Sequence, residues 1–200
     1  CVRGEQAKAL IHAFFAERAA TKLPDDVGGL APAEIRTVAI VGAGTMGAGI
    51  AMACANAGLE VYLTDATADG LASGEASIRR NYDITIARGR QTPASVAERL
   101  ARIHLTPSAA FAARAGEADL VIEAVFEDLA VKKQVFAEII DVVDPGALLC
   151  SNTSTLPITD LAAGVPRPAD FIGLHFFSPV DKMPLVEIIR GEQTSDAALA

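Results

Sequence analysis

The sequence predicts an α/β domain with a doubly wound, mostly parallel β-sheet, preceded by a separate helix. From Thr37 onward, apolar runs of about six residues alternate with stretches of helical periodicity, which is typical of successive βαβ units. The run at 119–125 is almost continuously apolar, as expected of a strand covered on both faces. Residues 22–32 are rich in Pro, Gly and Asp and form a linker between this pattern and a first helix at 5–20.

The first elements follow from periodicity and from glycine positions. The helix at 5–20 is predicted to be amphipathic, because apolar residues recur at helical spacing: Ala7, Leu10, Ile11, Phe14 and Phe15. A strand at 37–41 leads through a glycine turn into a helix at 45–57, and Gly58 stands where a C-terminal cap is expected. A second strand is predicted at 60–64.

The rest of the chain repeats the alternation. Residues 68–102 have helical periodicity interrupted by Gly and Pro at 89–93, which predicts two helices, and a short strand follows at 103–105. The remaining expected elements are a strand at 119–125, a helix at 129–142, a strand at 147–151, a short helix at 157–163, and strands at 171–177 and 185–189.

Composition excludes several classes of protein. Hydrophobic residues make up 51% of the 200 residues, which provides a core and argues against disorder. The net charge of −8 argues against a nucleic-acid partner, because such an interface needs a basic face. The cysteines Cys1, Cys54 and Cys150 lack disulfide or metal-ligand spacing, which suits a reducing compartment and predicts no metal. No signal peptide is recognisable, and no apolar run approaches the ~18 residues of a membrane span.

A glycine loop, GAGTMG at 42–47, follows the first strand of the pattern. Gly42 permits a tight turn, Gly44 leaves room for a pyrophosphate, and Gly47 allows the helix to pack closely on the sheet. Backbone N–H groups at the helix start, with the helix dipole, attract a diphosphate. In this context the loop predicts a Rossmann-type dinucleotide-binding domain; the alternative is a glycine turn that serves only the packing of the αβ unit.

An acidic residue ends the second strand. Asp65 lies eighteen residues after Gly47, close to the spacing expected of the carboxylate that accepts hydrogen bonds from the adenosine ribose. Its charge repels a 2′-phosphate, and neither Ala66 nor Thr67 supplies the arginine that such a phosphate needs. The sequence therefore favours NAD over NADP.

The chain has three histidines. His12, on the first helix, is interpreted as a surface residue and His104, in a short strand, as a structural one. His175 stands near the carboxyl end of a strand, where open α/β sheets bind their ligands. It is a candidate general base for oxidising an alcohol, with Glu187 in the next strand holding its ring. A satisfied structural histidine is an equally weighted alternative.

Further polar residues follow two other strands. The hydroxyls of SNTST at 151–155 are candidates to bond a substrate or the cofactor, or simply to cap the next helix. Glu123 and Glu127 flank the end of the 119–125 strand, where an acid can meet the nicotinamide ribose, and Lys132 can steady it or a phosphate. Surface solvation is the alternative for these charges.

A local basic cluster is formed by Arg79, Arg80, Arg88 and Arg90. Such a cluster can meet the phosphates of coenzyme A, although arginines on exposed helices are more often only solvated.

Four segments together resemble the 3-hydroxyacyl-CoA dehydrogenase family. They are VAIVGAGTMGAGIA at 38–51, DLVIEAVFEDLAVKKQVF at 119–136, SNTSTLPIT at 151–159 and GLHFFSPVDKMPLVEIIRG at 173–191. The opening EQAKALIHAFFAER resembles the helix that joins the enoyl-CoA hydratase part to the dehydrogenase part in multifunctional fatty-acid oxidation α-subunits.

The resemblance implies roles residue by residue. It implies that His175 is the catalytic base, that Glu187 is its partner and that Ser154 contacts substrate and nicotinamide. It places Met46 and Asp65 at the adenosine half of NAD, and Glu127 and Lys132 near the nicotinamide end. Ser178 stands where many single-function members have Asn; multifunctional members also use Ser, so this difference indicates the subtype.

The resemblance also implies how the chain is organised. Residues 1–33 are expected to be a linker helix and linker after an upstream hydratase region, 34–191 the NAD-binding domain, and 192–200 the start of a helical C-terminal domain. That domain, in the family, closes the acyl-CoA site and supplies a catalytic Asn. A first residue other than Met and a final helix of about one turn also predict a longer parent protein.

The expected activity is NAD-dependent oxidation of a 3-hydroxyacyl-CoA to the 3-ketoacyl-CoA in fatty-acid β-oxidation. The expected partners are an acyl-CoA substrate and, for the full-length protein, a thiolase subunit. A bacterial-type cytoplasmic location is expected, with a mitochondrial or peroxisomal one left open. Two other readings remain: a module that binds NAD without turnover, and a Rossmann dehydrogenase of another small hydroxy acid.

Overall fold

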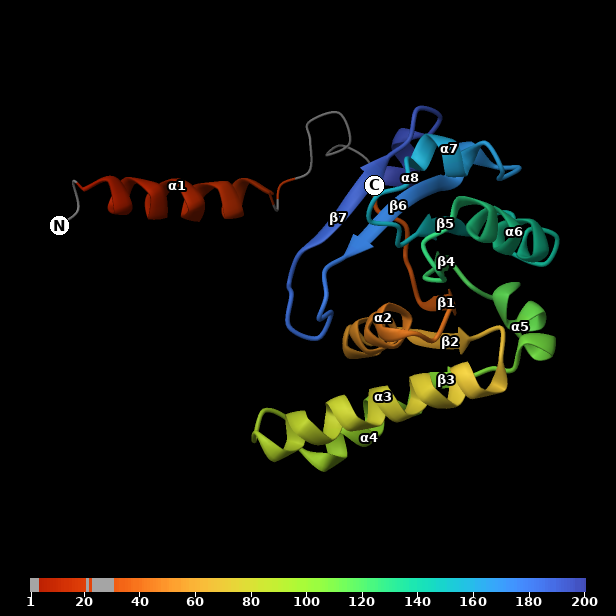
Figure 1. Ribbon diagram of the computed structural model, residues 1–200, viewed down its shortest axis with the longest axis horizontal. Coiled ribbons are helices and arrows are strands. Elements are labelled where there is room, and N and C mark those ends of the chain that lie inside the picture. Colours follow the sequence, from red (N-terminus) through yellow and green to blue (C-terminus); the bar gives the residue numbers. More distant parts are fainter. Residues whose placement is uncertain (1–3, 21, 23–30) are drawn as a thin grey trace. The chain divides into compact units, whose positions relative to one another are not determined.

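The computed structural model describes residues 4–20, 22 and 31–200 and divides the chain into two compact units, 1–33 with Ala200, and 34–199 (Figure 1). In the first unit, α1 (Glu5–Ala20) is the expected helix, and none of its residues is buried. Leu10 and Phe15 are 65% and 64% exposed. His12 on the same helix is exposed, as expected.

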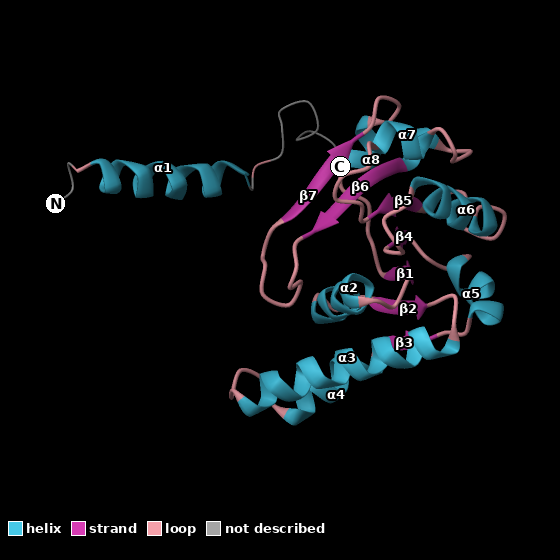
Figure 2. Cartoon of the chain, in the orientation of Figure 1, coloured by secondary structure: helices cyan, strands magenta, loops and turns pink. Residues whose placement is uncertain are grey.

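The second unit is a seven-stranded sheet with helices on both faces (Figure 2). Its strands are β1 (Thr37–Val41), β2 (Glu60–Thr64), β3 (Ile103–Leu105), β4 (Leu120–Glu123), β5 (Leu148–Ser151), β6 (Phe171–Phe176) and β7 (Val186–Arg190). Its helices are α2 (Thr45–Asn56), α3 (Ala68–Ala87), α4 (Pro93–Ala101), α5 (Ser108–Ala115), α6 (Leu129–Ile139), α7 (Ile158–Ala162) and α8 (Asp196–Leu199), with a 3₁₀ turn η1 (Pro168–Asp170).

The strand order is β3-β2-β1-β4-β5-β6-β7, and every neighbouring pair is parallel except β6 and β7. This order confirms the predicted Rossmann-type, doubly wound and mostly parallel sheet. Strands β2 and β3 are added on one side of β1, whereas β4 and the later strands are added on the other side. The carboxyl ends of β1 and β4 therefore flank the crevice in which open α/β sheets bind ligands.

Two hydrophobic cores lie on opposite faces of the sheet. One contains buried residues of α2, α3 and α4, such as Ile50, Ile78 and Val96. The other contains buried residues of α5, α6 and α7, such as Phe111 and Phe136. The central strands are thus covered on both sides, which explains why their sequences are continuously apolar rather than alternating.

Local sequence signals explain most helix boundaries. The side chains of Thr67, Thr92 and Asp128 accept hydrogen bonds from backbone N–H groups in the first turns of α3, α4 and α6. Gly58 has a φ of +94°, as expected of the residue that follows a helix. In the described part of the chain, no helix combines the length and hydropathy that crossing a bilayer requires.

The structure differs from the predicted elements mainly in three places. The strand predicted at 119–125 ends at Glu123, because the Glu123 carboxylate accepts a hydrogen bond from the Val125 N–H and turns the chain. The helix predicted at 129–142 ends at Ile139. Helix α5 was not predicted, although Phe111 and Ala115 are spaced as on one buried helical face.

Candidate cofactor and catalytic site

The glycine loop joins β1 to α2, and each glycine has a distinct structural reason. Gly42 has a φ of +104°, and a Cβ there would lie 2.6 Å from the Ala124 carbonyl oxygen. A Cβ at Gly47 would overlap the Gly42 carbonyl oxygen. A Cβ at Gly44 would have no neighbour within 4 Å, since this residue faces open space at the start of α2. The loop thus leaves an unobstructed helix N-terminus, which suits a diphosphate.

Asp65 follows β2 and lies beside this loop. Its Oδ2 accepts a hydrogen bond from the Ala43 N–H at 2.9 Å, and its Oδ1 accepts one from the Thr67 N–H at 3.2 Å. These bonds fix the carboxylate and leave lone pairs on both oxygens for further donors. The neighbouring Thr64 hydroxyl is buried and has no partner in the structure. An adenosine ribose, with its hydroxyl donors, fits this arrangement.

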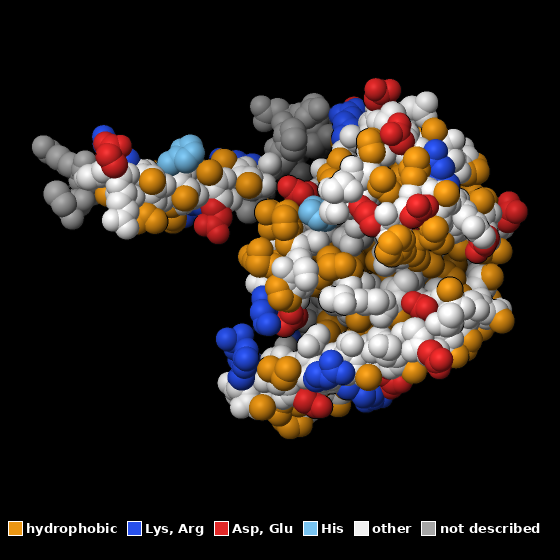
Figure 3. Space-filling model, viewed as in Figure 1, with side chains coloured by type: hydrophobic (Ala, Val, Ile, Leu, Met, Phe, Trp, Pro, Cys, Tyr) orange, Lys and Arg blue, Asp and Glu red, His pale blue; other side chains and the backbone are white. Residues whose placement is uncertain are grey.

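A cleft of about 760 Å³, here called the outer cleft, runs past both features. Gly44, Met46 and Asp65 line one side, and apolar residues of α5 and α6 such as Phe111 and Val135 line the other. A largely apolar wall with a few polar groups is typical of a nucleotide site. In the space-filling view, hydrophobic side chains surround a hollow in the visible face of the domain (Figure 3).

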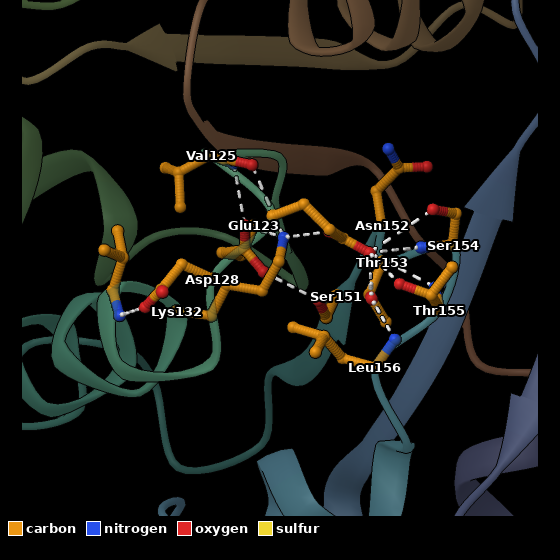
Figure 4. A network of polar contacts seen from close by, with 12 residues as sticks. Glu123, Val125, Asp128, Lys132, Ser151, Asn152, Thr153, Ser154, Thr155 and Leu156 are labelled. Carbon is orange, nitrogen blue, oxygen red and sulfur yellow. Dashed lines mark hydrogen bonds and ion pairs between the residues drawn. The ribbon is translucent and has the colours of Figure 1, made fainter.

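Glu127 accepts hydrogen bonds from three residues of the loop after β5, which are labelled in Figure 4 as Thr153, Ser154 and Thr155. Its Oε1 accepts from the Thr153 hydroxyl at 2.6 Å, from the Ser154 N–H at 2.9 Å and from the Thr155 N–H at 3.2 Å. Partial burial raises the pKa of Glu127, but the Thr153 and Ser154 donors and the Lys132 charge outweigh it and lower the pKa to about 2. Glu127 is therefore ionised at neutral pH.

A buried ion pair lies behind Glu127. Lys132 Nζ is 2.8 Å from Glu123 Oε1 and 3.2 Å from Glu127 Oε2, and the Lys132 and Glu123 side chains are 1% and 0% exposed. Glu123 Oε2 accepts the Ser151 hydroxyl at 2.6 Å. Surface solvation, the alternative considered for these charges, is wrong for Glu123 and Lys132. Glu123 is also too deeply buried to contact a ribose in the cleft.

His175 and Glu187 face one another across the antiparallel β6–β7 pair. They are opposite each other in register, and His175 Nδ1 lies 2.8 Å from Glu187 Oε2. Because a carboxylate only accepts, this bond places the imidazole proton on Nδ1 and leaves the Nε2 lone pair free. The His175 side chain is 18% exposed, so it remains accessible.

A second cavity of about 340 Å³, here called the inner pocket, brings the candidate residues together. Met46 from α2 lines it, as do Glu127, Ser154 and His175 from three other segments. Met46 also lines the outer cleft, so the two spaces meet at the start of α2. A dinucleotide bound along the glycine loop would therefore reach from Asp65 toward His175.

Other candidates lie away from this site. His104 is paired with Glu60 at 2.8 Å and stacks on Tyr62 on the β2–β3 side of the sheet, which agrees with a structural role. In the arginine cluster, Arg79 forms an ion pair with Glu75 on the surface of α3. Arg79, Arg80, Arg88 and Arg90 are all exposed. Among the described residues, no group of three or more His, Cys, Asp or Glu side chains is arranged to hold a metal ion.

Sequence reasoning missed one residue, and one of the two alternatives it left open for another group is wrong. Asn152 lines the inner pocket, and its Oδ1 accepts the Phe176 N–H at 2.9 Å, which ties the end of β5 to β6 next to His175. The 151–155 hydroxyls were also considered as caps of the next helix. Helix α7 has no side-chain cap, and the Ser151, Thr153 and Ser154 hydroxyls instead donate to Glu123 and Glu127.

The doubly wound sheet, the glycine loop and the acidic residue at the end of β2 define a domain of the dinucleotide-binding class. Residues 37–200 match the family described as "3-hydroxyacyl-CoA dehydrogenase, NAD binding domain". The chain belongs to this family, as the sequence segments predicted, and NAD is the cofactor of such domains.

Relatives agree with this assignment. The chain is 40% identical over 195 residues to a fatty acid oxidation complex subunit alpha of Psychrobacter arcticus, covering 98% of this chain and 27% of that protein. It thus spans about a quarter of the length of the curated relatives it matches.

Solved structures with a similar fold include the following two chains, each of which this chain covers in part. (S)-3-hydroxybutyryl-CoA dehydrogenase from Ralstonia eutropha is 44% identical with a TM-score of 0.78, over 82% of this chain and 57% of that one. FadB2 of M. tuberculosis is 40% identical with a TM-score of 0.79, over 83% and 57%.

Proposed function

We propose that the protein containing this chain oxidises a 3-hydroxyacyl-CoA to the 3-ketoacyl-CoA, and that residues 34–191 hold NAD for this reaction. The observation that carries the proposal is the His175–Glu187 pair, which lines the same inner pocket as Glu127, Ser154 and the start of α2. The names of the relatives, among them an (S)-3-hydroxybutyryl-CoA dehydrogenase and fatty acid oxidation complex subunits, support the choice of substrate.

Each residue of the candidate site has a different role in the proposed reaction. NAD⁺, when bound, supplies the acceptor for the hydride. His175 Nε2 takes the proton from the substrate hydroxyl, and Glu187 holds the ring and stabilises the imidazolium that results. Ser154, held at the pocket wall by Glu127, contacts substrate and nicotinamide. The diphosphate and the adenosine half are bound by the glycine loop and the end of β2, through Gly42, Gly44, Met46, Gly47 and Asp65. Lys132 does not contact the cofactor directly but acts through Glu127.

The wider setting is also a proposal. Residues 1–33 are assigned to a linker helix after a hydratase region, and 192–200, with α8, to the start of a helical C-terminal domain. A thiolase subunit is the proposed partner, and the bacterial cytoplasm is the proposed location. The relatives' description as subunits of a fatty acid oxidation complex supports this setting.

The test compares two histidines that are each 2.8 Å from a glutamate oxygen. In the complete enzyme, His175→Ala should lower kcat by about 10²- to 10⁴-fold, the usual contribution of a general base, with NADH affinity nearly unchanged. His104→Ala, which removes a histidine from the β2–β3 side of the sheet, should leave kcat within a factor of about two. Full turnover by the His175 variant would remove this residue from the mechanism.

A further inference from the structure

The inner pocket has an unbalanced charge. The Glu127 network consists of Glu123, Glu127, Lys132 and the hydroxyls bonded to them, and it contains two carboxylates and one ammonium. Figure 4 labels Glu123, Lys132 and the hydroxyl donors Ser151 and Thr153. The Glu123 carboxylate accepts hydrogen bonds from three groups: the Val125 N–H, Lys132 Nζ and the Ser151 hydroxyl. Lys132 therefore neutralises one of two negative charges.

The surplus charge is directed at the pocket. Glu123 and Lys132 have no exposed surface, whereas the Glu127 side chain is 34% exposed and lines the inner pocket. The described residues that line this pocket include no lysine or arginine. No lysine or arginine in the described pocket wall therefore offsets the charge, and a partly desolvated pocket screens it less than bulk water does.

We propose that Glu123, a positioning residue outside the set that contacts the cofactor, maintains a net negative charge at Glu127 that favours oxidised over reduced nicotinamide. The proposal rests on the proposed function, because it needs the nicotinamide to lie in the inner pocket beside His175. The oxidised nicotinamide ring carries a positive charge and the reduced ring carries none, while the two dinucleotides are otherwise alike. A fixed negative charge therefore strengthens binding of NAD⁺ relative to NADH.

The consequence concerns turnover in the oxidising direction. Each oxidation leaves the reduced dinucleotide in the site, and the next cycle requires it to be exchanged for the oxidised one. A pocket that prefers the oxidised ring assists this exchange. If Lys132 faced a single carboxylate, the network would be neutral and this preference would be lost.

The ratio of dissociation constants, Kd(NADH)/Kd(NAD⁺), separates this role from a purely structural one. A variant that merely loosens the site weakens both dinucleotides equally and leaves the ratio unchanged. Glu123→Gln and Glu127→Gln each remove one negative charge while keeping the shape of the side chain. Each should lower the ratio by about 4- to 17-fold at low salt, from Coulomb's law for a unit charge roughly 10 Å away at an effective dielectric constant of about 20 to 40.

Two matched controls are available in the same domain. Glu138→Gln removes an equal charge from a residue that lines the outer cleft but not the inner pocket. Ser151→Ala removes a hydrogen bond to Glu123 but no charge. Both should leave the ratio within about a factor of two.

The measurement is titration calorimetry of the 200-residue chain with NAD⁺ and with NADH at two salt concentrations. A ratio that falls in both charge variants, less so at high salt, supports the proposal. Glu127→Gln is the less disruptive variant, because Glu127 lies at the surface of the pocket. If the ratio of dissociation constants is unchanged in this variant, the proposal is overturned. If the unsubstituted chain binds neither dinucleotide, the proposed function itself fails, and this outcome is distinct from an unchanged ratio.

Discussion

Lys132 illustrates how a charged residue can belong to a protein core. Its side chain is 1% exposed, and its ammonium contacts the Glu123 and Glu127 carboxylates and, at 3.4 Å, the Val125 carbonyl oxygen. Burial of an ammonium is costly, so the pair persists only because these partners replace the lost water. From the sequence, Lys132 is simply one turn into a helix, where solvation is the usual outcome. Only the packing of α6 against the end of β4 reveals its burial.

The first prediction at this scale concerns that ion pair. Lys132→Met should lower the free energy of unfolding by about 3–5 kcal/mol, because it leaves two carboxylates without their shared counter-charge. Arg79→Gln breaks an exposed pair with Glu75 and should cost about 0.5 kcal/mol or less. Urea unfolding of both variants measures the difference. Equal losses would mean that the buried pair contributes no more than a surface one.

The second prediction concerns the pH dependence of stability at Glu127. Its pKa of about 2 in the folded chain lies below the ordinary glutamate value of 4.5, so it adds stability that is complete above about pH 4.5. This contribution is lost as the pH falls from about 4.5 toward 2. Between pH 6 and pH 3, urea unfolding should show a smaller fall for Glu127→Gln than for the unsubstituted chain.

A graded variant checks the cause of this effect. Thr153→Val removes the 2.6 Å hydroxyl donor to Glu127 but keeps the carboxylate. Its pH dependence should lie between the other two, since one of the groups that hold the carboxylate ionised is gone. Identical slopes in all three proteins would show that Glu127 does not contribute to acid unfolding.

At the scale of the element, substitutions in the glycine loop before α2 can distinguish an effect on stability from an effect on NADH binding. Gly47→Ala should destabilise the domain strongly and weaken NADH binding, because its Cβ would overlap the Gly42 carbonyl oxygen. Gly44→Ala meets open space, so stability should change by only about 0.5 kcal/mol. NADH binding should nevertheless weaken, since the new methyl group stands where the diphosphate approaches. Unimpaired binding by a folded Gly44→Ala chain would argue that the diphosphate does not lie there.

Elements with local signals were predicted well from the sequence. Strand β2 and the start of α6 have the predicted boundaries, because apolar runs and N-terminal caps are encoded within a few residues. Helix α5 was missed because only one full turn of it faces the core. The end of β4 was placed too late because apolar composition continues past Glu123, where a side-chain hydrogen bond turns the chain.

At the scale of the whole domain, the pairing of strands that are far apart in the chain could not be predicted from the sequence. It predicted a parallel sheet but neither the strand order nor the antiparallel β7, since both depend on contacts between segments far apart in the chain. The candidate site has the same character. His175 and Glu187 were paired from the sequence because they lie on successive predicted strands, whereas the Glu123–Ser151 contact depends on the β4–β5 register.

The last prediction follows from how the site is assembled. The spaces that would receive NADH are lined by α2, the end of β2, α5, α6 and the ends of β4, β5 and β6, so bound NADH would join both halves of the sheet. At an NADH concentration 100 times its Kd, ligand linkage adds about 2.7 kcal/mol to the folded domain. For a domain of this size, Tm should then rise by roughly 5–10 °C, as measured by differential scanning calorimetry. NADPH at the same concentration should raise Tm less, because Asp65 opposes its 2′-phosphate; an equal rise would assign Asp65 no part in selecting the cofactor.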